Sequence, residues 1–287
     1  MRRSEAVVVP FGFSYRQYVE NGMVREEDVA DIRSWCDEFS LPVLSEEQAV
    51  LFLFSCDNDT EFTKRTIETA FEIKNSSPLI FDNRRMSGED IQGVLSICNV
   101  CMVPQKTSDG STILILQAKL KEGDEVKWHI RGLLKLTCML LEAAMFANPK
   151  CEFIIVFDVQ HVTMKHITRI KPKVMKIFIQ YLQEGLSGKL KAIHIVNMMS
   201  ILNKLLKVLK PFIKKEVWNM THFHSRGKNL SSFYKYVPTE YLPEDFGGCH
   251  PPLSVLNDVT VHTLTSMEGY FESEEIFRHS MDDREEQ

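Results

Sequence analysis

The order of apolar segments along the chain predicts an α/β fold. Short continuous apolar runs of strand length, at 111–118, 152–158 and 190–196, alternate with longer segments of helical periodicity. A continuous apolar run is typical of a strand whose sheet is covered on at least one full face. The 287 residues, 44% of them hydrophobic and 25% charged, are enough for one main domain and a small appendage.

The first 86 residues predict a small helical bundle. Helices are expected at 24–39, 45–54 and 60–74. Ser45 is expected to cap the second of these helices, because Gln48 follows three residues later and completes a capping box. The third helix is expected to bury Phe62, Ile67, Ala70 and Phe71.

Strands and helices alternate through the rest of the chain. The expected order is strand 111–118, helix 126–147, strand 152–158, helix 171–184, strand 190–196, helix 198–213 and strand 217–223. The segment 88–104 has a mixed pattern and receives no assignment. The stretch 272–287 is acidic, with seven acids and two bases, and is expected to form a frayed tail.

The segment 198–213 is the most clearly amphipathic part of the chain. One half of its helical wheel holds Met198, Ile201, Leu202, Leu205, Leu206, Leu209, Phe212 and Ile213, and the other half holds Lys204, Lys207, Lys210 and Lys214. Two interpretations remain open. The helix either packs on the core as an ordinary surface helix, or acts as a lid whose lysines face an anionic membrane.

Composition and charge exclude several classes of protein. The formal net charge of −5 provides no global basic field, so no nucleic-acid partner is expected. The N-terminus has no adequate apolar stretch for a signal peptide, and no apolar run reaches the roughly 20 residues that span a bilayer. We therefore expect a cytoplasmic monomer whose seven cysteines are free thiols.

No motif supports catalysis, a metal site or a cofactor. Cys98 and Cys101 form a lone Cys-x-x-Cys pair without the second pair that a structural zinc site needs, so two buried thiols are expected. His222 and His224 share one strand face but have no evident third ligand. Asp158 ends a buried strand, where a carboxylate usually caps local backbone, and the chain has no nucleophile elbow.

Three stretches carry a family resemblance when they are taken in order. They are Ile193-His194-Ile195-Val196-Asn197, a helix ending in Lys210-Pro211-Phe212, and Leu242-Pro243-Glu244-Asp245-Phe246-Gly247-Gly248. The series resembles the second half of a CRAL-TRIO lipid-binding domain. The resemblance implies a helical subdomain at 1–86, then a domain at 87–271 with a mixed sheet as floor, flanking helices and a gate helix, and an acidic tail at 272–287.

The resemblance also implies one hydrophobic ligand between the sheet and the gate helix. It places around the pocket Thr137, Leu141, Phe153, Ile155, Phe157, Met164, Ile170, Val174, Phe178, Tyr181, Leu182 and Leu186. Thr137 and Tyr181 are the expected polar contacts to a ligand head group. The gate face is expected to consist of Ile201, Leu202, Leu205, Leu209 and Phe212.

A phosphoinositide site, which some members of this family have, is weakly supported. Relatives carry arginines after the Leu-Phe-Leu stretch, where this chain has Phe54-Ser55-Cys56-Asp57. The remaining candidates are Lys189, Lys191, Lys214 and Lys215. The expected function is transfer of a tocopherol-, retinoid- or other isoprenoid-like lipid, with transient contact to an anionic membrane. The alternative is a phosphoinositide- or membrane-recognising adaptor that no longer carries a ligand.

Overall fold

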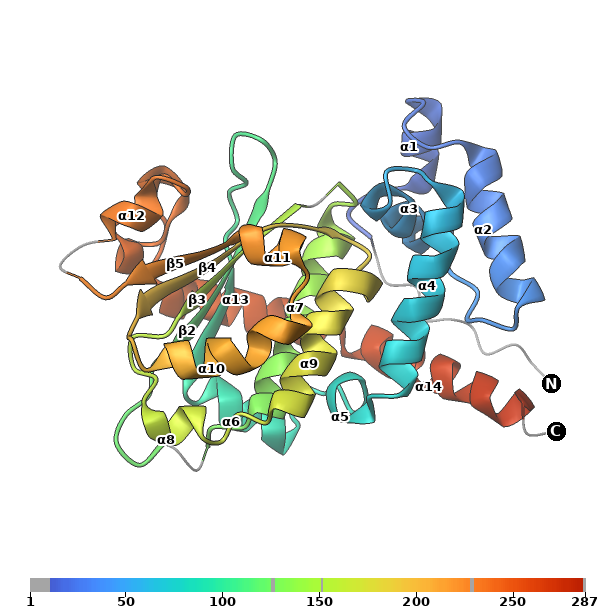
Figure 1. The fold of residues 1–287 in the computed structure, drawn as a ribbon. Coiled ribbons are helices and arrows are strands. Elements are labelled where there is room, and N and C mark those ends of the chain that lie inside the picture. Colours follow the sequence, from blue (N-terminus) through green and yellow to red (C-terminus); the bar gives the residue numbers. More distant parts are fainter. Residues whose placement is uncertain (1–10, 125–126, 151, 228–229, 286–287) are drawn as a thin grey trace.

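The computed structural model describes residues 11–124, 127–150, 152–227 and 230–285. A five-stranded sheet lies between helices on its two faces, and a helical bundle packs beside it (Figure 1). The strands follow chain order, as β1 (Cys98–Met102), β2 (Thr112–Ala118), β3 (Glu152–Asp158), β4 (Lys189–Met198) and β5 (Thr221–Ser225). β1 is antiparallel to β2, and the other pairs are parallel, which confirms the predicted α/β class with a mixed sheet.

The bundle contains the three helices that were predicted. Its elements are α1 (Tyr15–Glu20), α2 (Glu26–Glu38), α3 (Glu46–Ser55), α4 (Thr60–Asn75) and α5 (Pro78–Phe81). The capping box is confirmed: the Gln48 backbone N–H donates to Ser45 Oγ at 3.1 Å, and the Ser45 N–H donates to Gln48 Oε1 at 2.9 Å. The prediction that Phe62 is buried was wrong, because this residue is 48% exposed. The inner face of α4 begins one residue later, at Thr63, four positions before Ile67.

The remaining helices connect and cover the strands. They are α6 (Glu89–Leu95), α7 (Ile130–Ala147), α8 (Met164–Ile167), α9 (Pro172–Gln180), α10 (Leu202–Leu209), α11 (Lys215–Asn219), α12 (Ser231–Tyr234), α13 (Leu253–Ser266) and α14 (Glu268–Glu285). A π-helical turn, Tyr181–Gly185, follows α9, and short 3-10 turns lie at Lys210–Phe212, Thr239–Tyr241 and Glu244–Phe246. Figure 1 shows α9 and α10 on one side of the sheet and α13 on the other.

The central strands β2 and β3 are buried on both faces, which accounts for their continuous apolar runs. Leu114 and Leu116 of β2 belong to an apolar cluster with α7 and α9, whereas Ile113 and Ile115 belong to a second cluster with α12 and α13. The side chains of β3 alternate between the same two apolar clusters. A central parallel strand covered on both faces has no solvated side chains to interrupt its apolar sequence.

β1 is the strand that the sequence pattern did not assign. It lies at the edge of the sheet, and its outer backbone groups bond to side chains of α13 instead of another strand. The Val100 N–H donates to Asn257 Oδ1, and the Met102 N–H donates to Thr260 Oγ1, each at 3.0 Å. These contacts protect the edge and join segments that are more than 150 residues apart.

Two expected elements near the amphipathic segment differ in the structure. The predicted strand 217–223 begins as helix α11, and β5 starts only at Thr221, which pairs with Ile193 of β4. The predicted helix 198–213 is shorter, because β4 continues to Met198 and α10 starts at Leu202. In both places, pairing between neighbouring strands decides the boundary, and local periodicity does not contain that information.

The prediction of a frayed tail at 272–287 was also wrong. This stretch is helical up to Glu285 and is anchored by buried ion pairs. Glu274 of α14 accepts from Lys74 Nζ at 3.1 Å and from Arg84 Nη2 at 2.5 Å. The same two cations bind Glu142 of α7, each at 3.0 Å. Burial alone raises the pKa of the Glu274 carboxyl, but Lys74, Arg84 and Arg278 outweigh it and lower that pKa to about 2.

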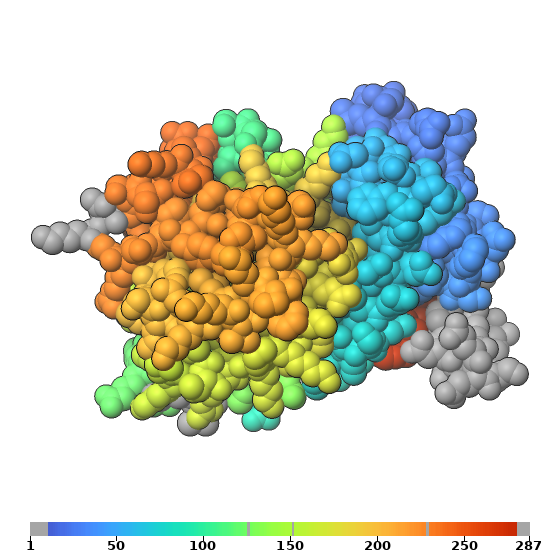
Figure 2. All heavy atoms as spheres, viewed as in Figure 1, coloured from blue at the N-terminus to red at the C-terminus, as the bar shows by residue number. Residues whose placement is uncertain are grey.

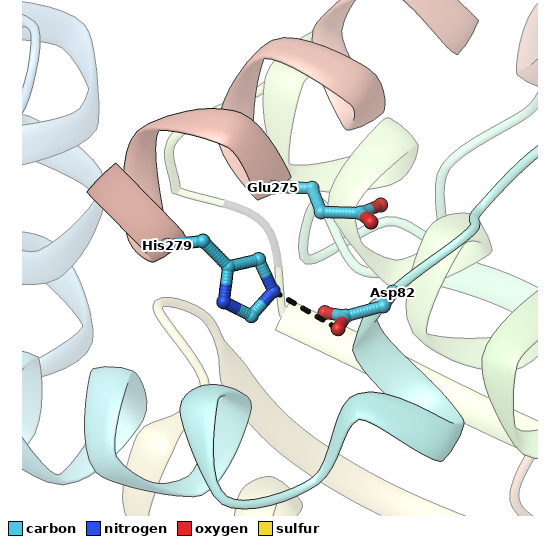
Figure 3. A group of neighbouring side chains, drawn as sticks. All are labelled: Asp82, Glu275 and His279. Atoms are coloured by element: carbon cyan, nitrogen blue, oxygen red, sulfur yellow. Dashed lines mark hydrogen bonds and ion pairs between the residues drawn. The ribbon is translucent and has the colours of Figure 1, made fainter. Parts of the chain in front are cut away.

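A second group of polar side chains holds the next turn of α14 (Figure 3). His279 Nε2 lies 2.9 Å from Asp82 Oδ2, and Arg278 Nη2 donates to Asp82 Oδ1 at 2.8 Å. Glu275 accepts from the Asn83 backbone N–H at 2.7 Å. These contacts join α14 to the chain that follows α5.

The Leu242–Gly248 stretch closes the face of the sheet that α13 covers. Phe246 is buried with residues of that face, and Asp245 Oδ2 accepts from the Leu253 N–H, the first residue of α13, at 2.7 Å. Gly247 has φ +72°, and a Cβ on Gly248 would lie 1.8 Å from the Leu242 carbonyl oxygen. The two glycines therefore allow a turn that other residues do not fit.

Gly248→Ala should lower the free energy of unfolding by about 3 kcal/mol, because the turn must open to admit the methyl group. Urea denaturation measures this change. The control is Gly93→Ala in α6, where the nearest atom would be 3.8 Å away. This helical substitution should stabilise the protein by about 0.5 to 1 kcal/mol. Equal effects of the two changes would contradict the steric argument.

Glu274→Gln should lower the free energy of unfolding by about 3 to 5 kcal/mol at pH 7, because it leaves buried cations without their carboxylate. The control on the same helix is Glu272→Gln, which removes a solvent-exposed pair with Arg85. That change should cost less than about 1 kcal/mol.

The stabilisation from Glu274 should also depend on pH in a defined direction. Its folded-state pKa of about 2 lies below the ordinary value of 4.5, so the stabilisation is fully present above pH 4.5. It is lost as the pH falls toward 2. The difference in stability between the wild type and Glu274→Gln should therefore shrink over this range, and a constant difference would contradict the assignment.

Candidate lipid-binding site

Most of the predicted pocket residues meet in one apolar cluster between the sheet and the helices α7 and α9. Eight are buried in it: Leu141, Phe153, Ile155, Val174, Phe178, Tyr181, Leu182 and Leu186. Phe157 and Ile170 pack against the same cluster. The structure thus brings together ten side chains from α7, β3, α9 and their flanking turns. Their contact with a ligand remains a prediction.

The other two predicted residues, Thr137 and Met164, lie differently. Thr137 is buried, but its hydroxyl donates to the Leu133 carbonyl of its own helix at 2.7 Å. Met164 is 37% exposed and lines an open cavity of about 500 Å³, together with residues such as His161 and Arg226. Met164 does not belong to the apolar cluster, and the Thr137 hydroxyl bonds within α7.

Tyr181, the other predicted polar contact to a ligand head group, is buried in the apolar cluster. Its ring packs edge-on against Phe81 of α5, with the ring centroids 4.9 Å apart. Burial raises the pKa of the Tyr181 hydroxyl, which therefore stays protonated and can act as a hydrogen-bond donor. This residue lies where the apolar cluster meets the helical bundle.

The predicted gate helix covers the apolar cluster with the face that was expected. Leu202 and Leu209 of α10 are buried, and Ile201 and Leu205 pack against the cluster. Phe212 departs from the prediction, since it is 36% exposed. The chain tightens into a 3-10 turn after α10, and this change of helical geometry turns Phe212 away from the inner face.

The end of the gate segment is tied to the π-helical turn. Gln183 Nε2 donates to the Phe212 carbonyl oxygen at 3.3 Å, and Gln183 Oε1 accepts from the Lys214 N–H at 2.7 Å. These two bonds hold the C-terminal end of the gate segment against the turn.

Three of the four predicted membrane lysines are paired with carboxylates. Lys189 pairs with Asp57, Lys191 with Asp109, and Lys214 with Glu184. Lys215 is exposed.

A different set of lysines forms a basic surface. Exposed lysines of α9 and α10 and their flanking residues adjoin on one side of the molecule: Lys171, Lys173, Lys176, Lys204, Lys207 and Lys210. We call this set the lysine face. Figure 2 shows the yellow and orange surface, to which α9 and α10 contribute, turned toward the viewer. Val208, 49% exposed, adds an apolar group to it. Sequence reasoning missed the contribution of α9, because contact between α9 and α10 is a tertiary feature.

The Cys98 and Cys101 thiols point to opposite faces of β1. Cys98 belongs to the apolar cluster beneath α7, and Cys101 belongs to the cluster beneath α13. Burial raises the pKa of each thiol to about 12. Both observations support the interpretation of two separate buried thiols, because metal ligands must converge and must lose their protons.

A third imidazole joins the two predicted on one strand face. His194 Nδ1 lies 3.0 Å from His224 Nε2, and the ring of His194 stacks on His222 with centroids 5.0 Å apart. Burial, followed by the neighbouring His224 and His222, lowers the pKa of His194 to about 3. The group packs against the rings of Phe233 and Tyr236.

One group of three potential metal ligands occurs among the residues for which the structure gives positions. It consists of Asp82, Glu275 and His279, whose ligand atoms lie within 4.8 Å of one another (Figure 3). Each of the three is already engaged with a protein group, as described above. Their observed role is to anchor α14.

A cavity of about 770 Å³ lies at the junction of the helical bundle, α7 and α14, and we call it the junction cavity. It contacts Tyr181 and Gly185 of the π-helical turn, but otherwise lies outside the predicted pocket. Sequence reasoning missed it, because the expected frayed tail left α14 out of the folded structure. The apolar residues Ile276 and Phe277 within the acidic stretch were the available signal.

No helix of the described residues is long and apolar enough to cross a membrane.

Comparison with known proteins identifies related sequences. The family model of the CRAL/TRIO domain matches residues 98–248, which is more than half of the chain. Clavesin-2 of Rattus norvegicus is 29% identical over 146 residues, covering 50% of this chain and 43% of clavesin-2. Clavesin-1 of Xenopus laevis is 26% identical over 128 residues, covering 45% of this chain and 37% of clavesin-1. The chain spans less than half the length of these relatives.

The crystal structure of Sfh5 also aligns with this chain. The alignment covers 88% of this chain and 82% of Sfh5, with a TM-score of 0.49 and 14% sequence identity.

Proposed function

The chain belongs to the CRAL/TRIO domain family, and we propose that it is an intracellular, cytoplasmic carrier that binds one small hydrophobic lipid and transfers it between membranes. The observation that carries this proposal is the family match over 98–248. The apolar cluster beneath α10 supports it, because it gathers ten of the residues that the family resemblance assigns to the pocket. The proposed ligand class is tocopherol-, retinoid- or other isoprenoid-like, and the carrier has no catalytic role.

The physical basis is the removal of apolar surface from water. Each Å² of lipid buried against the protein contributes about 25 cal/mol, so a dry site beneath α10 retains a lipid without ionic contacts. To admit the ligand, the inner face of α10 must move away from the sheet. We propose that the movement pivots near Gln183, which holds the C-terminal end of the gate segment.

The lysine face supports membrane docking during this exchange. Its six exposed lysines lie on or beside α9 and α10, and α10 is the element that must move. Near an anionic bilayer each such residue contributes about 1 kcal/mol of attraction, and salt screens this contribution. Docking and gate opening would then occur on the same side of the protein.

Organic extraction and mass spectrometry test the proposal, after incubation of the purified protein with a cell lipid extract. The expected result is one apolar lipid at a stoichiometry near one. A bound phospholipid would replace the proposed ligand class. The absence of any bound lipid, under conditions that load a known carrier of the family, would overturn the carrier function.

Leu205→Glu should abolish ligand retention while the protein remains folded, because the carboxylate faces the apolar cluster from a half-buried position. Retention is measured by gel filtration of the loaded protein, and folding by circular dichroism. The control is Val208→Glu, which introduces the same group on the exposed side of α10. Normal retention by Leu205→Glu would count against a gate.

A membrane-recognising adaptor is the second candidate function. The close packing of the predicted pocket residues against one another favours it, because a module that has lost its ligand fills the site with its own side chains. The lysine face would serve this function as well. Vesicle binding without lipid extraction or transfer would identify the adaptor.

A further inference from the structure

The junction cavity has the dimensions of a small-molecule site. Its volume of about 770 Å³ falls within the range of roughly 300 to 1,000 Å³ that is typical of ligand pockets. It lies at the boundary between the helical bundle and the α/β domain, a common location for such sites. It adjoins the apolar cluster beneath α10 and shares Tyr181 with the predicted pocket, but its other lining residues lie outside that pocket.

The walls of the junction cavity are aromatic. Phe13, Phe52 and Phe71 line it from the bundle, and Phe146 and Tyr270 line it from α7 and α14. Phe146 and Tyr270 pack against each other, with ring centroids 4.7 Å apart. Such walls favour the binding of an apolar chain. The free energy gained when the chain leaves water is proportional to the apolar area that is buried.

Apolar side chains also surround the entrance. Val43, Ile276 and Phe277 line the cavity and are 37%, 64% and 38% exposed. Exposed apolar groups at the rim of a concave surface are a feature of ligand and partner sites. They continue the apolar wall outward from the cavity.

The junction cavity also has ionic lining residues, and their charges sum to zero. Its ionic lining residues are three cations, Arg33, Lys74 and Arg278, and three carboxylates, Glu47, Glu142 and Glu274. Lys74 donates to Glu142 and Glu274, and its ammonium has a third N–H to offer. Burial raises the pKa of the Tyr270 hydroxyl, so this group also stays protonated.

This balance of charges selects the head group of a ligand. An ionised head would require a counter-charge that the paired residues do not provide, and its burial would be costly. A hydroxyl-bearing head requires only hydrogen bonds. We propose that the junction cavity is a second ligand site, which holds a neutral amphiphile of the monoacylglycerol class, with its head near Lys74 and Tyr270 and its chain directed toward Ile276 and Phe277.

The proposed ligand would connect the bundle to α14. It would contact both sides of the ion-pair network, which already joins these elements through Glu274. A ligand that binds only the folded protein raises its thermal stability by mass action. The second site therefore acts on the stability of the junction, whereas the site beneath α10 serves lipid transfer. The inference stands independently of the proposed carrier function.

The probe for this proposal is a monoacylglycerol with a diazirine in its acyl chain, used below its aggregation concentration. After photolysis, peptide mass spectrometry should locate the label in α3, α4 or α14. Unlabelled monooleoylglycerol should compete at least tenfold better than oleate or a long-chain trimethylammonium. Labelling confined to β3, α9 and α10, or equal competition by all three amphiphiles, would overturn the proposal.

Two variants test the location of the label. Ser273→Trp introduces a large side chain into the wall of the cavity and should reduce labelling of α3, α4 and α14 at least tenfold. Ile276→Glu places a charge at the exposed rim and should reduce it at least fivefold without a risk to folding, because the residue is 64% exposed. Unchanged labelling in the folded Ile276→Glu variant would refute the proposed orientation and site.

Matched controls separate this site from the proposed carrier site. Val259→Glu introduces the same charge at a 57% exposed position of α13, outside the cavity, and should leave labelling unchanged. Leu205→Glu should also leave the junction label unchanged, even where it abolishes retention of the transferred lipid. Loss of the junction label in Leu205→Glu would assign it to the site beneath α10 and overturn the second site.

Discussion

The buried ion pairs around Glu274 are the constraint on which the arrangement of the molecule depends. Glu142 and Glu274 share the cations Lys74 and Arg84, although these residues come from the bundle, from the chain after α5, from α7 and from α14. A buried charge without its partner costs several kcal/mol, so these elements must be positioned together. α14 in turn forms one wall of the junction cavity.

α7 contributes to both proposed sites. Leu141, Met145 and Phe146 all belong to the apolar cluster, and Met145 and Phe146, with the neighbouring Glu142, also line the junction cavity. The proposed transfer site and the second site therefore adjoin at this helix, and Tyr181 borders both.

α10 contributes both to the cover of the apolar cluster and to the lysine face. α10 turns Leu202 and Leu209 toward the core and exposes Lys204 and Lys207. The same amphipathic pattern that stabilises the helix on the closed protein also suits it to lie at an anionic membrane surface. Under the proposed carrier function, docking of the lysine face would bring α10 to the membrane that receives the lipid.

The sequence alone determined the α/β class, the capping box at Ser45 and the inward face of α10, because each depends on local periodicity or on residues three or four positions apart. It did not predict β1, the start of β5 or the packing of α14. Those features depend on partners distant in the chain, such as Asn257 for β1 and Arg84 for α14. The lysine face and the junction cavity were likewise decided only by tertiary structure, since each is formed where elements from separate segments meet.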